Sequence, residues 1–102
     1  MNKWQQKMWY EQMIIWHKQM IVHHKQMISY CESAVKVNQH LIAPRKQVFA
    51  GHEISIQTED PERISNREER IQIFDLMKKT QESMIKQHEK MIAMHTNNMN
   101  TY

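Results

Sequence analysis

The amino-acid sequence is dominated by a seven-residue repeat near its N-terminus. Gln-Met-Ile recurs at 12–14, 19–21 and 26–28, and His-Lys-Gln-Met-Ile stands at both 17–21 and 24–28. Apolar residues that return every seven positions are typical of helices that pack side by side, because seven residues make almost two helical turns. The repeat therefore predicts a helix with one long apolar stripe.

The stripe continues well beyond the opening motif. Residues 1–43 contain neither glycine nor proline, and Pro44 cannot continue a helical hydrogen-bond ladder. This predicts one helix over about 3–42; the alternative is a helix that ends at 29–33, followed by a strand at 34–37. Two neighbouring series hold the spacing over five repeats: Ile14, Ile21, Ile28, Val35 and Ile42, and Met13, Met20, Met27, Ala34 and Leu41.

Residues 44–60 are the only segment with a strand-like pattern. Polar and apolar residues alternate over 53–57, and Gly51, the single glycine, stands where a tight turn needs a residue that accepts positive φ. The segment predicts a short β-hairpin, with an irregular connector as the alternative.

A second helix is predicted over about 62–96. It can start at Asp60-Pro61 or at a capping box formed by Ser65 and Glu68. The heptad spacing returns in two series: Ile64, Ile71, Lys78, Ile85 and Ile92, and Met77, Met84 and Met91.

The expected fold is mainly α. A single domain over 1–102 would form a long antiparallel helical hairpin with a short β-hairpin or loop at its tip and a disordered tail at 97–102. Ile15 and Val22 lie outside the apolar stripe, so we expect two copies to form a four-helix bundle, or one copy to dock on another protein. The order helix, β-hairpin, helix is similar in outline to prefoldin-type chaperone subunits, in architecture alone.

Four histidines occupy the second apolar position of the heptads, at 17, 24, 88 and 95. In a hairpin that turns near 52–53, His17 would face His88 and Tyr10 would face His95. A symmetric dimer could bring four imidazoles into one layer, which would suit zinc, copper or haem. The candidate metal ligands are therefore His17, His24, His88 and His95.

The alternative interpretation of these histidines is a hydrogen-bonded polar layer that fixes the helix register. Histidines seven residues apart lie about 10 Å apart along one helix and cannot share a metal. The sequence contains no His-x-x-x-His pair and no Glu-x-x-His motif. Packing is the interpretation that we favour.

The predicted interaction surface is rich in Met, Ile and Trp. Methionine is flexible and suits adaptable binding surfaces, although the 10 Met residues could also reflect coding bias. A second seam with coiled-coil spacing is open to the first helix: Trp9, Met13, Trp16, Met20, His23, Met27 and Tyr30. The surface comprises Trp9, Met13, Trp16, Met20, Ile21, Met27, Ile28, Met84, Ile85, Met91 and Ile92.

Charge and cysteine content limit the partners. The net charge of +3 comes from the first helix, and the later Arg residues are interleaved with Glu, which argues against nucleic acid. The tryptophans are more readily explained by packing than by a membrane surface, and no apolar run is long enough for a transmembrane helix or a signal peptide. Cys31 has no cysteine partner, so we expect a cytoplasmic protein.

No motif for catalysis is present: there is no nucleophile elbow, phosphate loop or pair of carboxylates in an apolar surround. The sequence therefore favours a non-enzymatic interaction or oligomerisation protein that binds itself or another protein. The alternatives are a histidine-lined bundle that binds a metal ion or haem, and a small DNA-associated helical regulator.

Overall fold

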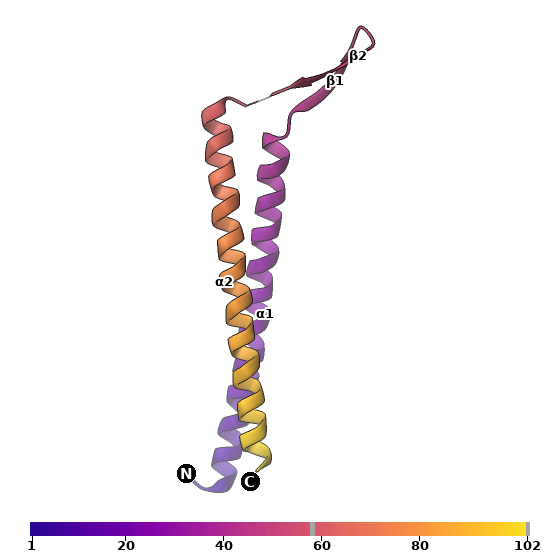
Figure 1. Cartoon of the computed structure of the whole chain (residues 1–102). Coiled ribbons are helices and arrows are strands. Elements are labelled where there is room, and N and C mark those ends of the chain that lie inside the picture. The colour runs from indigo at the N-terminus through magenta and orange to yellow at the C-terminus, as the bar shows by residue number, and fades with distance from the viewer. Residues whose placement is uncertain (58, 102) are drawn as a thin grey trace. The chain divides into compact units, whose positions relative to one another are not determined.

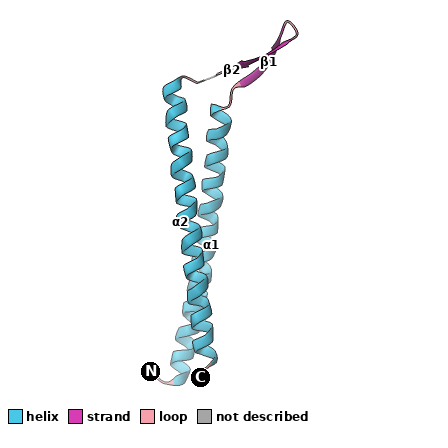
Figure 2. Cartoon of the chain, in the orientation of Figure 1, coloured by secondary structure: helices cyan, strands magenta, loops and turns pink. Residues whose placement is uncertain are grey.

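The computed structural model describes residues 1–57 and 59–101. The elements follow the order α1 (Lys3–Ile42), β1 (Arg45–Phe49), β2 (His52–Ile56) and α2 (Pro61–Asn100) (Figure 1). Each helix is 40 residues long, and the two strands are the short segments that connect them (Figure 2). The helices pack against each other. The predicted mainly α hairpin with a β-hairpin between its helices is confirmed.

Helix α1 begins with a reciprocal cap that the sequence analysis missed. The Gln5 backbone N–H donates to Asn2 Oδ1 at 2.8 Å, and the Asn2 backbone N–H donates to Gln5 Oε1 at 3.0 Å. This satisfies two amides that have no partner inside the helix. The helix runs without a break to Ile42, so the alternative strand at 34–37 is wrong.

Helix α2 starts at Pro61 and not at the Ser65 capping box. The Arg63 backbone N–H donates to Asp60 Oδ1 at 2.9 Å, which makes Asp60 the N-cap. Proline suits the next position because its fixed φ matches a helix and its missing N–H would have no partner there.

The C-terminal end of α2 differs from the prediction. A tail was expected over 97–102, but the helix continues to Asn100. Met99 is half-buried and follows Ile92 by seven residues, so the apolar series extends one heptad further. Thr101 Oγ1 then donates to the Asn98 carbonyl at 2.7 Å. The last residue of the expected tail, Tyr102, lies outside the described residues.

Strands β1 and β2 form an antiparallel hairpin in which Arg45 pairs with Ile56 and Phe49 with His52. The turn residues Ala50 and Gly51 have φ of 51° and 80°. Positive φ at both central positions defines a type I′ turn, whose twist matches that of the strands. The hairpin prediction is confirmed over the irregular connector, and Gly51 has the predicted backbone. Every strand residue is exposed.

The chain forms two compact units. The first comprises Met1–Ser29 with Lys79–Tyr102, and the second comprises Tyr30–Lys78. Along both helices, burial follows two positions of each heptad, which we call the seam positions: the isoleucine series and the histidine series. The alternative seam is wrong for the contact between the helices, because Trp9 and Trp16 remain 44% and 47% exposed.

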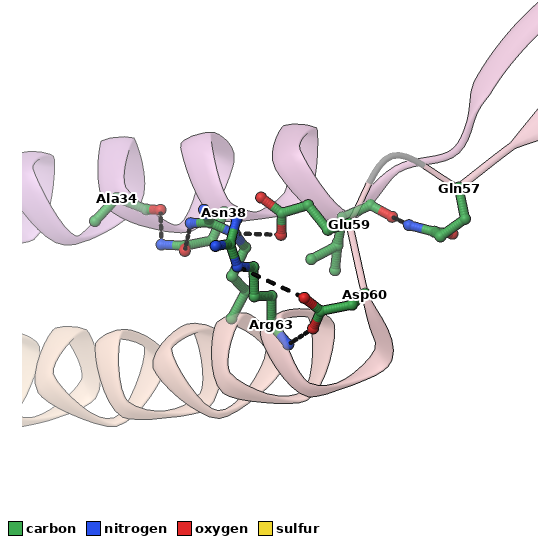
Figure 3. A network of polar contacts seen from close by, with 8 residues as sticks. Ala34, Asn38, Gln57, Glu59, Asp60 and Arg63 are labelled. Atoms are coloured by element: carbon green, nitrogen blue, oxygen red, sulfur yellow. Dashed lines mark hydrogen bonds and ion pairs between the residues drawn. The ribbon is translucent and has the colours of Figure 1, made fainter.

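Polar contacts in the second unit connect the two helices near the start of α2. Asn38 Nδ2 donates to the Ala34 carbonyl at 2.8 Å (Figure 3). Arg67 Nη1 donates to Asn38 Oδ1 at 3.4 Å. Arg67 Nε donates to Glu59 Oε2 at 2.6 Å. This hydrogen bond lowers the pKa of the Glu59 carboxyl and raises the pKa of Arg67. These contacts fix the loop before α2 to both helices.

Lys78 occupies an isoleucine position of the heptad, which would bury a charge. Its Nζ lies 3.3 Å from Glu32 Oε1 of α1 in the same unit. A lysine can cover the seam with its methylene groups while its ammonium group reaches the surface. The ion pair therefore explains how the helical contact tolerates a lysine at this position.

Candidate functional site: a histidine ladder beneath a Met/Trp face

Four histidines of the first unit come together between α1 and α2. His17, His24 and His95 are only 7%, 7% and 4% exposed, and His88 is half-buried. All four occupy the histidine series of the seam, as the heptad positions predict. A polar side chain that is buried to this extent needs hydrogen-bond partners.

The predicted pairing of helix positions is confirmed. His17 Nδ1 and His88 Nδ1 lie 2.7 Å apart, so one ring donates its N–H and the other accepts. Tyr10 lies opposite His95, with ring centroids 5.7 Å apart. His24 Nδ1 donates to Gln81 Oε1, because the amide oxygen can only accept, and this hydrogen bond fixes the tautomer of His24.

The rings also stack between layers. His17 stacks on His95 with centroids 5.5 Å apart and planes 24° apart, and His24 stacks on His88 at 5.3 Å and 26°. The rings therefore follow one another in the order His95, His17, His88, His24, with α2 and α1 alternating. We call these four side chains the histidine ladder. A symmetric dimer was predicted to bring four imidazoles into one layer; within one chain, the four rings instead lie in successive layers.

Two tryptophans of α1 cover histidines of α2. Trp9 meets His95 edge to face, with centroids 5.4 Å apart at 90°, and Trp16 meets His88 at 5.7 Å and 74°. Both indoles keep nearly half of their surface exposed. The tryptophans therefore lie on the side of the helix pair where the ladder is, and each still presents an aromatic surface to the outside.

Burial is the main influence on the charge of His17. Desolvation lowers the pKa of His17, and the neighbouring His88 and His95 lower it further through charge repulsion. A lowered pKa keeps His17 neutral at pH 7, which is the form that can share one proton with His88. In contrast to Nδ1 of His17, Nδ1 of His95 is buried and has no hydrogen-bond partner among the described residues.

Methionines flank the ladder on both helices. Residues four before or three after a helical position are its neighbours, so Met13, Met20 and Met27 border the ladder on α1. The isoleucine series is bordered instead by charged residues, among them Lys18 and Glu89. We define the Met/Trp face by seven members of the predicted interaction surface that lie on the ladder side of the first unit: Trp9, Met13, Trp16, Met20, Met27, Met84 and Met91.

The remaining members of the predicted interaction surface have another place. Ile21, Ile28, Ile85 and Ile92 are half-buried and belong to the isoleucine series of the seam. Their spacing has the same period as that of the methionines, so the repeat alone could not separate residues that join α1 to α2 from residues that face outward.

Over residues 1–57 and 59–101, no group of three or more His, Cys, Asp or Glu side chains is arranged to hold a metal ion. Within the same ranges, neither helix includes an apolar stretch that could cross a bilayer. The arrangement defines a helical hairpin with a polar aromatic seam. Comparison with known proteins found no matching family model, curated protein or solved structure.

Proposed function

We propose that this protein is a non-enzymatic oligomerisation protein whose Met/Trp face binds a second copy of the chain, giving a four-helix bundle. The observation that carries the proposal is the small core of the described chain. Its buried apolar side chains are Ile14 and Cys31, whereas Trp9, Trp16 and Met84 are 44%, 47% and 39% exposed. Stability of a helical protein comes mostly from packing its apolar faces, so these side chains favour a partner surface.

The composition of the face favours a second copy as that partner. In a two-fold symmetric dimer the same patch contacts itself, so a charge near the two-fold axis would meet its own copy. In the first unit, the heptad positions that supply the Met/Trp face hold no Asp, Glu, Lys or Arg, whereas Lys18, Lys25, Glu82 and Glu89 lie beside the isoleucine series. Methionine and tryptophan are also enriched at protein interfaces.

A cytoplasmic location is part of this proposal, because Cys31 is the single cysteine of the chain and is buried.

Size-exclusion chromatography with light scattering tests the proposal. We expect the mass of a dimer for the unmodified chain, and a monomer after the combined changes Trp16→Gln, Met20→Gln and Met27→Gln. The matched control is Ile15→Gln with Val22→Gln, which removes exposed apolar side chains from the charged side of α1. The control should remain dimeric. A monomeric unmodified chain, or equal dissociation of the control, would contradict the proposal.

A further inference from the structure

One layer of the first unit carries a histidine on each helix. His17 Nδ1 and His88 Nδ1 point at each other across 2.7 Å. The neighbouring layers differ, because His24 meets Gln81 and His95 meets Tyr10. Two imidazole nitrogen atoms from different helices therefore converge in the His17/His88 layer.

The same layer is flanked by two thioethers. Met20 stands three residues after His17, and Met91 stands three residues after His88. Helical side chains lean toward the N-terminus and cover the preceding turn, so we expect each methionine to lean over the histidine of its own helix. Both methionines are half-buried. Because the helices are antiparallel, Met20 and Met91 stand on opposite sides of this layer along the helix axis, each within one helical turn of the layer.

The buried nitrogen of His95 is a second observation at this place. Its ring stacks on His17 with centroids 5.5 Å apart, and its Nδ1 has no hydrogen-bond partner among the described residues. A buried polar atom without a partner costs free energy. Among the described residues, hydrogen bonding therefore leaves one buried nitrogen unsatisfied in the layer next to the His17/His88 pair.

We propose that His17, His88, Met20 and Met91 bind one soft monovalent cation of the Cu(I) type. Thioether sulfur and imidazole nitrogen together select Cu(I) over harder ions such as Mg²⁺ or Ca²⁺. With metal–nitrogen bonds of about 2.0 Å, a tetrahedral site places two nitrogens about 3.3 Å apart. Small rotations of the two rings would open the present 2.7 Å to that distance.

Binding needs no net loss of a proton. In the neutral pair one Nδ1 carries the shared proton; this proton leaves for solvent and a proton from solvent attaches to Nε2 of the same ring, so both Nδ1 lone pairs become free. All four ligands come from one chain, so the site does not depend on self-association. The copper ion enters as Cu(I) and remains Cu(I) when it is bound.

The test uses Ag(I), a redox-inert analogue of Cu(I), added as the nitrate in chloride-free buffer to protein with ¹³C-labelled methionine methyl groups. We expect saturation at one Ag(I) per chain, with the Met20 and Met91 methyl signals shifting first among the 10 methionines. The variant Met20→Leu with Met91→Leu keeps the apolar volume and should lower the affinity at least about tenfold, since even changes outside the ligand shell cost that much.

The matched control is Met27→Leu with Met84→Leu, which changes the methionines beside the His24/Gln81 layer. The control should bind Ag(I) as the unmodified protein does. Equal weakening of the control, or simultaneous shifts of all methionine methyl groups, would overturn the proposal, as would tighter binding of Zn(II) than of Ag(I). His17→Gln should also weaken binding; if that variant loses helical circular dichroism, the methionine variants, which keep both histidines, decide.

Discussion

His17 of α1 and His88 of α2 join the two helices through a hydrogen bond between their Nδ1 atoms, which lie 2.7 Å apart. The bond exists only while one of the two nitrogens lacks a proton. Protonation of both rings would set two N–H donors and two positive charges against each other inside the helical contact. The stability of the first unit is therefore linked to pH.

Acid should destabilise the protein through His17. Its pKa in the folded state lies below the ordinary value of 6.5, because burial and the neighbouring His88 and His95 oppose its charge. Between the folded and unfolded pKa values, the unfolded chain binds more protons, so stability is fully present above about pH 6.5 and is lost as pH falls toward the folded pKa. Urea unfolding followed by circular dichroism at pH 7.5 and pH 5.5 would show a lower midpoint at pH 5.5.

A substitution separates His17 from the other titrating groups. His17→Gln should reduce the difference between the midpoints at the two pH values. His52→Gln changes an exposed histidine of β2 and should leave that difference as it is. If His17→Gln has the same pH dependence as the unmodified chain, the lowered pKa of His17 does not contribute to stability.

Ile14 should be one of the most sensitive apolar positions. It is 9% exposed, whereas the adjacent Ile15 is 54% exposed. Ile14→Ala removes buried methyl groups and should lower the free energy of unfolding by about 2 kcal/mol or more. Ile15→Ala should change it by no more than about 0.5 kcal/mol. Parallel denaturant titrations at a fixed protein concentration would measure both, and equal losses would argue against this seam.

The start of α2 depends on an oxygen acceptor at position 60. Asp60→Ala removes the acceptor for the Arg63 N–H and should destabilise the protein by about 1 kcal/mol. Asp60→Asn keeps an oxygen in the same place, so its effect should be smaller. Thermal unfolding of both variants checks this order, and the reverse order would mean that the cap contributes little.

The β-turn should improve with a different residue at position 50. Ala50 adopts a φ of 51°, which side chains other than Asn and Asp rarely favour, whereas Gly51 at 80° is well suited. Ala50→Asn supplies the preferred Asn-Gly pair of a type I′ turn and should increase the population of the hairpin. Stronger cross-strand NOEs between Val48 and Glu53 would report it; weaker NOEs would contradict the turn geometry.

The helical pattern could be predicted from the sequence because it depends on spacing alone. The heptad spacing, together with the lack of Gly and Pro before Pro44, predicts the bounds of α1, and pairing positions about a turn near 52–53 predicts that His17 meets His88. The second result needs only the helical period and an antiparallel hairpin. The same reasoning applied to Met99 would have placed the end of α2 correctly, since it continues the series seven residues after Ile92.

Other features required coordinates. Stacking of His17 on His95 depends on side-chain torsions that heptad spacing does not determine. The contact between Arg67 and Glu59 depends on the conformation of the loop before α2, and no repeat describes that loop. The sequence also did not determine whether Trp9 and Trp16 lie between the helices or on the outer face, because both seams of α1 have the same period.

The polar pairs across the seam determine the alignment of the two helices, which the isoleucines alone would not. Shifting α2 by one heptad would still set one apolar series against the other, so the repeat tolerates several alignments. The polar pairs are compatible with one alignment. A shift of α2 by one heptad would place Arg67 opposite Cys31 and separate it from Asn38, which accepts its hydrogen bond. The non-identical polar pairs thus select a single alignment of the two helices from those that a uniform apolar seam would leave almost equal in energy.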